Sequence, residues 1–221
     1  MQLELKNIKK DFVSKSGRHH KCLENMNLVI ESGELHLLYG ASGNGKTTLL
    51  NIMTGMLRPS AGQVLLNGKE IQSMKEHELA QLRRKCFGYA MQNASLLASL
   101  TVYENIALPM SFLSKRESTV IEEQLKKAGL WKVRDSYPSE LSGGEYRRCT
   151  ILRALINQPD FLFADEPTAN LDDENAEIII EMLNELRKKG TAVIVATHDK
   201  RFMEKEHPGI VSRFLVAPVL E

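Results

Sequence analysis

Gly40-Ala-Ser-Gly-Asn-Gly-Lys-Thr47 is the stretch of sequence that decides the fold. It fits the pattern G-x-x-x-x-G-K-[ST] without a mismatch. The apolar run at 35–39 before it predicts a strand, and TTLLNIMTG after it has the periodicity of a helix that ends at Gly55. A strand, a glycine-rich turn and a helix in this order predict a phosphate-binding loop. The glycines let backbone N–H groups converge on phosphate oxygens at the positive end of the helix dipole.

Two side chains of this loop and two carboxylates further along the chain suit a nucleoside triphosphate bound together with Mg²⁺. Lys46 is suited to the β and γ phosphates, and the Thr47 hydroxyl is suited to Mg²⁺. The apolar run at 161–164 predicts a buried strand that ends in Asp165 and Glu166. Adjacent carboxylates are costly at such a place unless a cation is present. We therefore expect Asp165 to hold Mg²⁺ directly or through water, and Glu166 to orient the water that attacks the γ-phosphate.

The order of predicted elements indicates one domain with two lobes. Strands are expected at LELKNI and MNLVI in the first forty residues, on either side of a polar loop that includes His19 and His20. Residues 68–84 have a polar helical pattern, and a short strand is expected at 87–91. Strands disappear after Asn93 and return at 161–164 and 192–197, with an amphipathic helix between the last two, which implies a parallel crossover.

These patterns predict an α/β fold of the P-loop NTPase class over residues 1–221. Its nucleotide-binding core would comprise residues 1–92 and 159–221, with a mostly parallel sheet and an antiparallel β subdomain at the N-terminus. A helical insertion would occupy about 93–158, with interruptions at Pro109, Gly129 and Pro138.

Composition narrows the function classes. The 221 residues are 43% hydrophobic, and 29 Lys and Arg against 28 Asp and Glu give a net charge of +1, so no basic surface for nucleic acid is indicated. The sequence lacks a run of roughly 18 apolar residues that could span a bilayer and a signal-peptide pattern, which predicts a cytoplasmic protein. The three cysteines are far apart in the sequence and are expected to be free thiols.

The segment Leu141-Ser-Gly-Gly-Glu145 predicts a second anion-binding site. Ser142 and the N–H groups of Gly143 and Gly144 would lie at the start of a helix, which suits a γ-phosphate. One triphosphate does not need two such sites in the same subunit.

Six motifs in order now carry a resemblance to a known family. Besides the three motifs above, Gln92 follows a predicted strand, Ala169-Asn-Leu-Asp172 follows the acidic pair, and His198 ends the last apolar run. With these, the chain resembles the ATP-binding cassette (ABC) ATPases over essentially its whole length. The segments LAQLRRKCFGYAMQ, LLASLTVYENIALPM and DEPTANLD are similar to the ATPase subunits of macrolide-exporter and lipoprotein-release systems, and of related cell-division and peptide-efflux cassettes.

The resemblance implies that two cassettes pair head to tail and clamp two ATP molecules between them. The catalytic group would be Glu166, His198, Lys46 and Gln92, with His198 holding the γ-phosphate and attacking water. Gln92 would sense the γ-phosphate and join Thr47 and Asp165 at Mg²⁺, and Asp172 would link the two ATP sites. The residues expected to contact ATP are Phe12, Gly40, Ala41, Ser42, Gly43, Asn44, Gly45, Lys46, Thr47, Thr48 and Gln92, and in trans Ser142, Gly143, Gly144 and Glu145. Phe12 would stack on adenine; the alternative is a plain core residue.

Three features depart from the family pattern. Glu145 stands where the family usually has Gln, which adds negative charge near a phosphate site. Asn44 replaces the more usual Ser, with little expected effect because backbone atoms bind the phosphates there. The C-terminal twenty residues lack the usual strand-turn-strand ending, so their strands stay open.

The resemblance implies a partner as well as an activity. The first hypothesis is an ATPase subunit that pairs with itself or a homologous cassette, docks on a separate membrane permease at the cytoplasmic face, and drives export or mechanical work. The segment 93–108 would form part of the docking groove, and its Leu96, Leu97 and Leu100 would otherwise be core. The alternatives are a soluble ABC ATPase acting on nucleic acid or the ribosome, which the near-neutral charge disfavours, and a nucleotide-binding regulator without turnover.

Overall fold

The strands form two sheets in the computed structural model, which describes residues 1–13, 17, 19–92, 96–110, 115–204 and 210–215. The antiparallel sheet has the order β2-β1-β4-β5, and the parallel sheet has the order β6-β7-β8-β3-β9. The antiparallel sheet consists of β1 (Gln2–Val13), β2 (His19–Glu31), β4 (Ala61–Leu66) and β5 (Lys69–Glu70). The parallel sheet consists of β3 (Leu35–Tyr39), β6 (Phe87–Ala90), β7 (Phe161–Asp165), β8 (Ala192–Thr197) and β9 (Ile210–Leu215).

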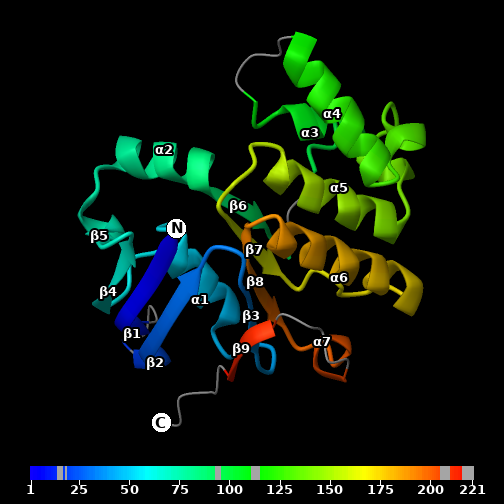
Figure 1. Ribbon diagram of the computed structural model, residues 1–221. Helices are drawn as coiled ribbons and strands as arrows, with labels where there is room; N and C mark the ends of the chain where they lie inside the picture. Colours follow the sequence, from blue (N-terminus) through cyan, green and yellow to red (C-terminus); the bar gives the residue numbers. More distant parts are fainter. Residues whose placement is uncertain (14–16, 18, 93–95, 111–114, 205–209, 216–221) are drawn as a thin grey trace.

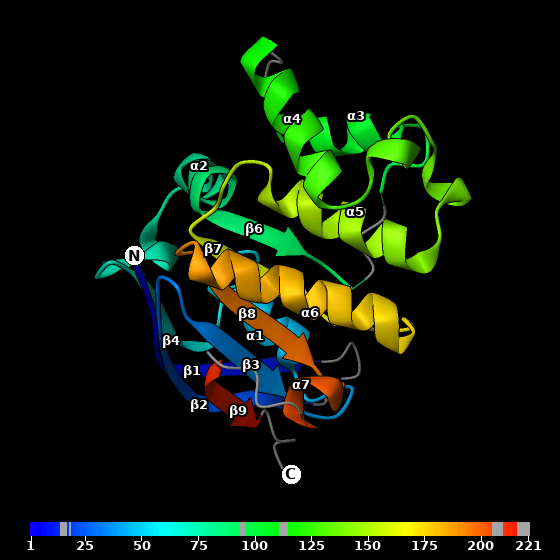
Figure 2. The same cartoon turned by 45° about the vertical axis from the view of Figure 1, so that its right-hand side comes forward.

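The helices divide between the two lobes. Figure 1 shows α3 and α4 away from both sheets, while Figure 2 shows α6 lying along the parallel sheet. The helices that accompany the sheets are α1 (Lys46–Met53), α2 (Glu76–Cys86), α6 (Asp173–Lys188), α7 (Arg201–Glu204) and the 3-10 turn η1 (Ile71–Ser73). The helical lobe contains α3 (Val102–Ala107), α4 (Lys115–Lys127), α5 (Gly143–Leu155) and the 3-10 turns η2 (Trp131–Val133) and η3 (Pro138–Glu140).

The apolar runs of β7 and β8 are continuous because both faces of the parallel sheet are covered. Phe161 and Phe163 pack with α1 and the antiparallel sheet on one face. Leu162 and Ala164 pack with α6 on the other face. Every residue of both strands is buried. This packing is the reason that a strand of this sheet shows no polar alternation.

The helical lobe has a hydrophobic core of its own. Val102, Ile106, Leu125 and Leu130 are fully buried there and pack against the outer face of α5. Cys149 of α5 belongs to this core, and burial raises the pKa of its thiol to about 12. These helices therefore share a hydrophobic cluster, and α5 also packs against α6 and the parallel sheet.

Three local expectations were wrong or incomplete. His19 and His20 begin β2, where they pair with Val13 and Phe12, so the tip of the hairpin is shorter than the polar pattern suggested. The helix expected over 68–84 starts only at Glu76, because β5 and η1 come first. The strand β4 was not anticipated. The C-terminal region, whose structure the sequence left open, contributes β9, which pairs in parallel with β3.

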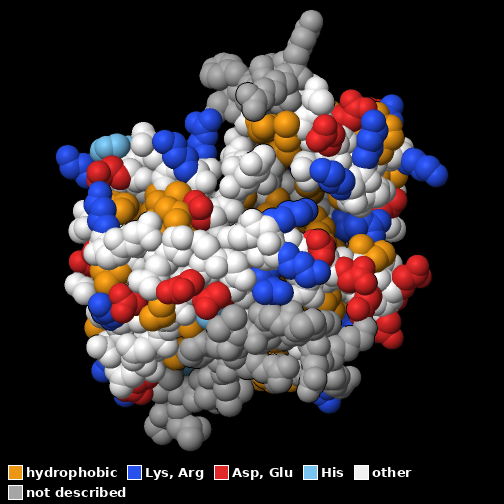
Figure 3. Space-filling model, viewed as in Figure 1, with side chains coloured by type: hydrophobic (Ala, Val, Ile, Leu, Met, Phe, Trp, Pro, Cys, Tyr) orange, Lys and Arg blue, Asp and Glu red, His pale blue; other side chains and the backbone are white. Residues whose placement is uncertain are grey.

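The surface carries both signs of charge. On the face shown in Figure 3, basic and acidic side chains are interspersed, and the hydrophobic side chains form small separate patches. This mixing agrees with the net charge of +1. In the part of the chain that the structure describes, no helix has both the length and the apolar composition needed to cross a membrane.

Candidate functional site

The phosphate loop lies at the carboxyl end of β3, where backbone geometry requires glycine. Gly43 and Gly45 have φ of +87° and +86°, which is the left-handed region that side chains rarely adopt. A Cβ on Gly45 would lie 2.9 Å from Cys22 Sγ and 3.0 Å from Leu23 Cδ2 of β2. The loop is therefore pressed against the antiparallel sheet, and α1 begins directly after it, with Leu49 donating its N–H to the Gly45 carbonyl at 2.8 Å.

Lys46 reaches back over this loop. Its side chain is only 5% exposed, and Nζ donates hydrogen bonds to the carbonyl oxygens of Gly40 at 2.6 Å and Ala41 at 3.1 Å. The same ammonium lies 3.4 Å from Glu166 Oε1. A buried lysine needs such partners, because an uncompensated charge would be costly away from water. Lys46 thus connects the phosphate loop with the acidic end of β7.

Asp165 is bound on one oxygen and unpartnered on the other. Its Oδ2 accepts a hydrogen bond from Thr47 Oγ1 at 2.7 Å. Its Oδ1 is buried and has no hydrogen-bond partner among the described residues. Burial raises the pKa of this carboxyl, against the opposing effect of the Thr47 hydrogen bond. A buried carboxylate oxygen beside a hydroxyl is a donor set that suits a hard divalent cation.

Glu166 is held in place by the end of β8. Its backbone has a positive φ of 48°, an uncommon conformation for a residue with a side chain. The Glu166 N–H donates to the Ala196 carbonyl at 2.8 Å. Oε2 accepts from Thr197 Oγ1 at 3.0 Å, and Oε1 lies 2.8 Å from His198 Nδ1. The Glu166 side chain is 6% exposed while that of His198 is 59% exposed, so this pair spans from the interior to the surface.

The sequence-predicted residues fall into two groups in space. The phosphate loop, Asp165, Glu166 and His198 lie together at the carboxyl ends of β3, β7 and β8, as expected for parallel strands. Thr197, whose hydroxyl binds Glu166, was missed by sequence reasoning, because a threonine that ends an apolar strand carries no signal of its own.

Two expected residues lie outside this group. Gln92 is exposed and lies two residues beyond the end of β6, and residues 93–95 after it are outside the described part. Phe12 is 40% exposed in β1, with Lys10 Nζ 5.0 Å from its ring centroid, so it is not a core residue. Stacking of Phe12 on adenine stays a prediction.

The second group is built where α5 and α6 begin side by side (Figures 1 and 2). Ser142 is the N-cap of α5, and its Oγ accepts from the Glu145 N–H at 3.3 Å. Glu145 Oε2 in turn accepts from Ser142 N at 2.9 Å and Oγ at 2.7 Å. These hydrogen bonds lower the pKa of the Glu145 carboxyl, so it is ionised at neutral pH.

The first turn of α6 packs against this helix start. Asp172 is the N-cap of α6 and accepts from Asn175 N at 2.8 Å and Nδ2 at 2.9 Å, which lowers the pKa of its carboxyl. A Cβ on Gly144 would lie 2.0 Å from Asn175 Oδ1, so the two helices approach each other through a glycine. Asp172 and the segment Leu141–Glu145, hereafter the signature segment, are therefore connected through Asn175.

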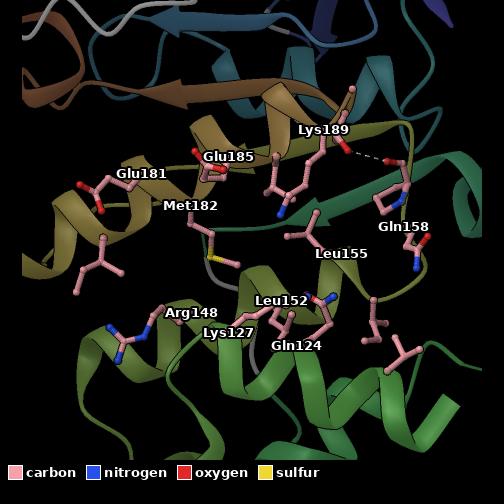
Figure 4. Close-up of a pocket in the computed structure, with 18 of the residues that line it drawn as sticks. Gln124, Lys127, Arg148, Leu152, Leu155, Gln158, Glu181, Met182, Glu185 and Lys189 are labelled. Atoms are coloured by element: carbon pink, nitrogen blue, oxygen red, sulfur yellow. Dashed lines mark hydrogen bonds between the residues drawn. The ribbon is translucent and has the colours of Figure 1, made fainter. Parts of the chain in front are cut away.

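A separate hollow of about 730 Å³ opens between α4, α5 and α6. Leu152 of α5 and Met182 of α6 reach into it from opposite sides (Figure 4). Its lining includes neither the phosphate loop nor the acidic end of β7. The hollow is thus a feature of the junction between the lobes, apart from the candidate site for phosphate.

Comparison with known proteins identifies the class. The family described as ABC transporter matches residues 23–169. The lipoprotein-releasing system ATP-binding protein LolD of Buchnera aphidicola subsp. Schizaphis graminum is 40% identical over 92% of this chain and 90% of its own length. The bacitracin export ATP-binding protein BceA of Halalkalibacterium halodurans is 40% identical over 89% of this chain and 79% of its own. The chain belongs to the ABC transporter family.

A larger relative and two solved structures point to the same class of protein. The macrolide export ATP-binding/permease protein MacB of Neisseria meningitidis is 39% identical over 89% of this chain, which covers 31% of that protein. The dimeric structure of the bacterial ABC transporter cassette MJ0796 has a TM-score of 0.83 and 34% identity, over 90% of this chain and 89% of that one. Another dimeric structure of MJ0796, a post-hydrolysis state bound to ADP and Pi, matches equally well. The chain is an ATP-binding and ATP-hydrolysing subunit of this class, with the ABC ATPase fold.

Proposed function

We propose that this protein is the ATPase subunit of a transporter or mechanical exporter of the macrolide-export and lipoprotein-release type. It pairs head to tail with a second copy or a homologous cassette around two ATP molecules, and the pair drives a separate membrane permease from the cytoplasmic face. The observation that carries this proposal is that the predicted site residues form two separate groups. Lys46, Asp165, Glu166 and His198 form one half of an ATP site, while the signature is built on a different helix start.

The two groups would complement each other across a head-to-tail dimer. The phosphate loop receives the triphosphate of its own subunit, with contacts from Gly40 to Thr48 and stacking of adenine on Phe12. The signature residues of the partner, at the positions Ser142 to Glu145, close over the γ-phosphate. Asp172 lies beside the signature through Asn175, which supports its assignment to communication between the two ATP sites.

The donor set also supports a magnesium ion. Thr47 Oγ1 and Asp165 lie in contact, and the unpartnered Asp165 Oδ1 adds a second oxygen. Thr47 and Asp165 would hold the ion, and Gln92, which lies outside their group, would join them as a further ligand. The ion would supply charge neutralisation at the β and γ phosphates. Ionisation of a buried carboxylate costs less beside a cation, which accounts for an acid at this place.

In the proposed hydrolytic step Glu166 is the general base. Its carboxylate accepts a hydrogen bond from the attacking water and takes the proton as the water oxygen bonds to the γ-phosphorus. The bond from the γ-phosphorus to the bridging oxygen breaks, and ADP leaves. Lys46 would attract the charge on the transferred group. His198, whose Nδ1 lies against Glu166, would hold the γ-phosphate with its other ring nitrogen.

The relatives support a transport role and leave the cargo open. Their names include lipoprotein release, bacitracin export and macrolide export, and MacB combines the ATP-binding and permease parts in one protein. We infer that this chain works with a permease of the same general kind and binds peripherally to the membrane through it. The net charge of +1 and the interspersed charges on the face shown in Figure 3 support this class over a nucleic-acid role.

Glu166→Gln tests the catalytic assignment. The variant keeps the metal ligands and loses the proton acceptor, so kcat for ATP hydrolysis is expected to fall by about 100- to 10,000-fold while ATP still binds. The ATP-bound variant should also form a stable dimer, measured by sedimentation velocity with and without ATP.

Glu181→Gln on the exposed side of α6 is the matched control and should hydrolyse ATP like the wild type. Equal turnover of wild type and Glu166→Gln would favour a nucleotide-binding regulator and remove the proposal. Salt-sensitive binding to nucleic acid without association with a permease would favour the other alternative.

A further inference from the structure

Arg201 and Asp199 form a bidentate ion pair directly after His198. Arg201 Nη2 donates to Asp199 Oδ2 at 2.7 Å, and Nε donates to the two carboxylate oxygens at 2.9 and 3.0 Å. Thr168 Oγ1 donates to the same carboxylate at 2.5 Å. The Asp199 side chain is 15% exposed and that of Arg201 is 29% exposed. A paired, planar guanidinium in such a position is held in one orientation.

The other N–H groups of Arg201 bind the segment that carries Asp172. Nη1 donates to the carbonyl oxygens of Leu171 and Asp172, both at 3.2 Å, and Nη2 donates to the Thr168 carbonyl at 3.2 Å. Nη1 also contacts Asp173 at 3.1 Å, but that carboxylate is 98% exposed and contributes little. One guanidinium thus connects three backbone carbonyls of residues 168–172 with the residue that follows His198.

The charges of the pair support this arrangement. Burial opposes ionisation of Asp199, but hydrogen bonds from Arg201 and Thr168 outweigh it and lower the pKa of the carboxyl. The hydrogen bond to Asp199 raises the pKa of Arg201. Both groups are therefore charged throughout the neutral range, and the connection does not depend on pH there.

Each end of this connection reaches a functional group. Asp199 N donates to Thr197 Oγ1 at 3.0 Å, and that hydroxyl donates to Glu166. On the other side, Asp172 caps α6 and binds Asn175, which packs against Gly144 of the signature. Contacts therefore run without a gap from the Glu166–His198 pair through Arg201 to Asp172 and Gly144.

We infer that Arg201 is a positioning residue that fixes the segment 168–172 to the His198 segment, so that the catalytic pair and the dimer-facing Asp172 move as one body. This inference rests on the proposed function, because Asp172 matters only if a partner cassette closes on it. Arg201 itself contacts neither the phosphate loop nor Asp165 in the interactions described. Its loss should therefore affect closure and the chemical step more than the binding of ATP to one subunit.

Arg201→Met tests the inference, because it keeps roughly the length of the side chain and removes every hydrogen bond that the guanidinium makes. We expect kcat for ATP hydrolysis to fall by about tenfold or more, since hydrogen bonds between charged groups are the strong ones. Binding of trinitrophenyl-ATP by the monomer should stay within about twofold of the wild type. In the Glu166→Gln background, ATP-dependent dimerisation measured by sedimentation should need a higher ATP concentration.

Arg201→Lys gives a second measurement that also holds if the Met variant folds poorly. One ammonium can pair with Asp199 but cannot also bind the three carbonyls, so kcat should lie between those of Arg201→Met and the wild type. Arg83→Met is the matched control. Arg83 also binds a carboxylate and a backbone carbonyl, those of Glu76 and Gly55, but it lies on α2 away from the dimer-facing segments, so its kcat should be unchanged.

The outcomes separate this inference from the proposed function. Turnover by the wild type with an unchanged kcat for Arg201→Met would overturn the role of Arg201 alone. A fall in kcat accompanied by an equal loss of monomer nucleotide affinity would also overturn it, since that pattern indicates damage to the ATP site. Absence of turnover in the wild type itself would instead remove the proposed function.

Discussion

The Glu145 carboxylate stabilises the start of α5 but places a negative charge beside the proposed phosphate site. Its carboxylate completes a capping box with Ser142, which satisfies N–H groups at the start of α5 and complements the helix dipole. The same negative charge lies where the partner's γ-phosphate is proposed to bind. Because Glu145 remains ionised at neutral pH, the two effects act together, and replacing only the charge should separate them.

Glu145→Gln is expected to strengthen the ATP-bound dimer. The amide keeps an oxygen that can cap the helix, while the repulsion toward phosphate disappears. In the Glu166→Gln background, half-maximal dimerisation should occur at about two- to fivefold lower ATP concentration, the range expected for one charge at a helix N-terminus. Sedimentation velocity across an ATP titration measures it.

Glu104→Gln is the control for this effect. Glu104 forms the same capping box with Thr101 at the start of α3, with Oε2 accepting from Thr101 N at 2.8 Å. Both variants should change thermal stability alike, and only Glu145→Gln should change dimerisation. An unchanged or weakened dimer in Glu145→Gln would show that the charge does not oppose phosphate binding.

Among the elements, the strands β3, β7 and β8 were predictable from sequence and β4 was not. A strand covered on both faces is a continuous apolar run, which stands out without any neighbour being known. In β4, only Val64 and Leu66 are buried, and Ala61 to Gln63 are exposed, so half of the strand carries no hydrophobic signal. The strand forms through its pairing with β1, a contact that the local sequence does not reveal.

The residues of the candidate site likewise differ in whether the sequence predicts them. The phosphate loop, Asp165 and Glu166 follow from local chemistry, because glycines and carboxylates at these places have few other uses. Arg201 does not, because the partners that it binds besides Asp199 include backbone carbonyls of residues distant along the chain. The sequence alone does not distinguish Arg201 from a basic residue on a solvated surface.

The contact between β6 and α5 depends on one glycine. A Cβ on Gly88 would lie 2.3 Å from the carbonyl oxygen of Ala154 and 2.9 Å from Pro159. Gly88→Ala should therefore force the strand and the helix apart and lower the free energy of unfolding by about 1–3 kcal/mol. Urea denaturation followed by circular dichroism measures the change.

Gly143→Ala provides the comparison for Gly88→Ala. A Cβ on Gly143 would lie 3.6 Å from Leu171, which is ordinary contact, so its free energy of unfolding should be close to that of the wild type. Equal stability of the two variants would mean that β6 and α5 can separate without cost, and that the lobes are not joined through this contact.

At the scale of the whole molecule, Gln92 lies where the core passes into the helical lobe. Beyond the undescribed residues 93–95, Leu96 is buried, while Leu97 is 44% exposed. Leu96 is thus core, as one alternative had it, whereas Leu97 remains available to a partner. The turn at residues 97–100 is held by the buried Asn105. This residue accepts from Leu97 N at 2.8 Å and donates to the carbonyl oxygens of Leu97 and Leu100. A rigid turn that presents an apolar side chain is suited to docking.

Gln92→Ala is expected to separate ATP binding from coupling to the permease. An exposed residue at this junction can respond to nucleotide and transmit the response to the helical lobe, whereas Lys46 and the phosphate loop hold most of the binding energy. ATP affinity should stay within about threefold, less than the loss of one strong hydrogen bond. The stimulation of ATPase activity by the permease, measured in proteoliposomes against the cassette alone, should fall markedly.

Gln81→Ala on the exposed face of α2 is the control and should leave both quantities unchanged. If Gln92→Ala reduced ATP binding and stimulation equally, Gln92 would be a ligand for nucleotide only, and the lobes would have to communicate by another route.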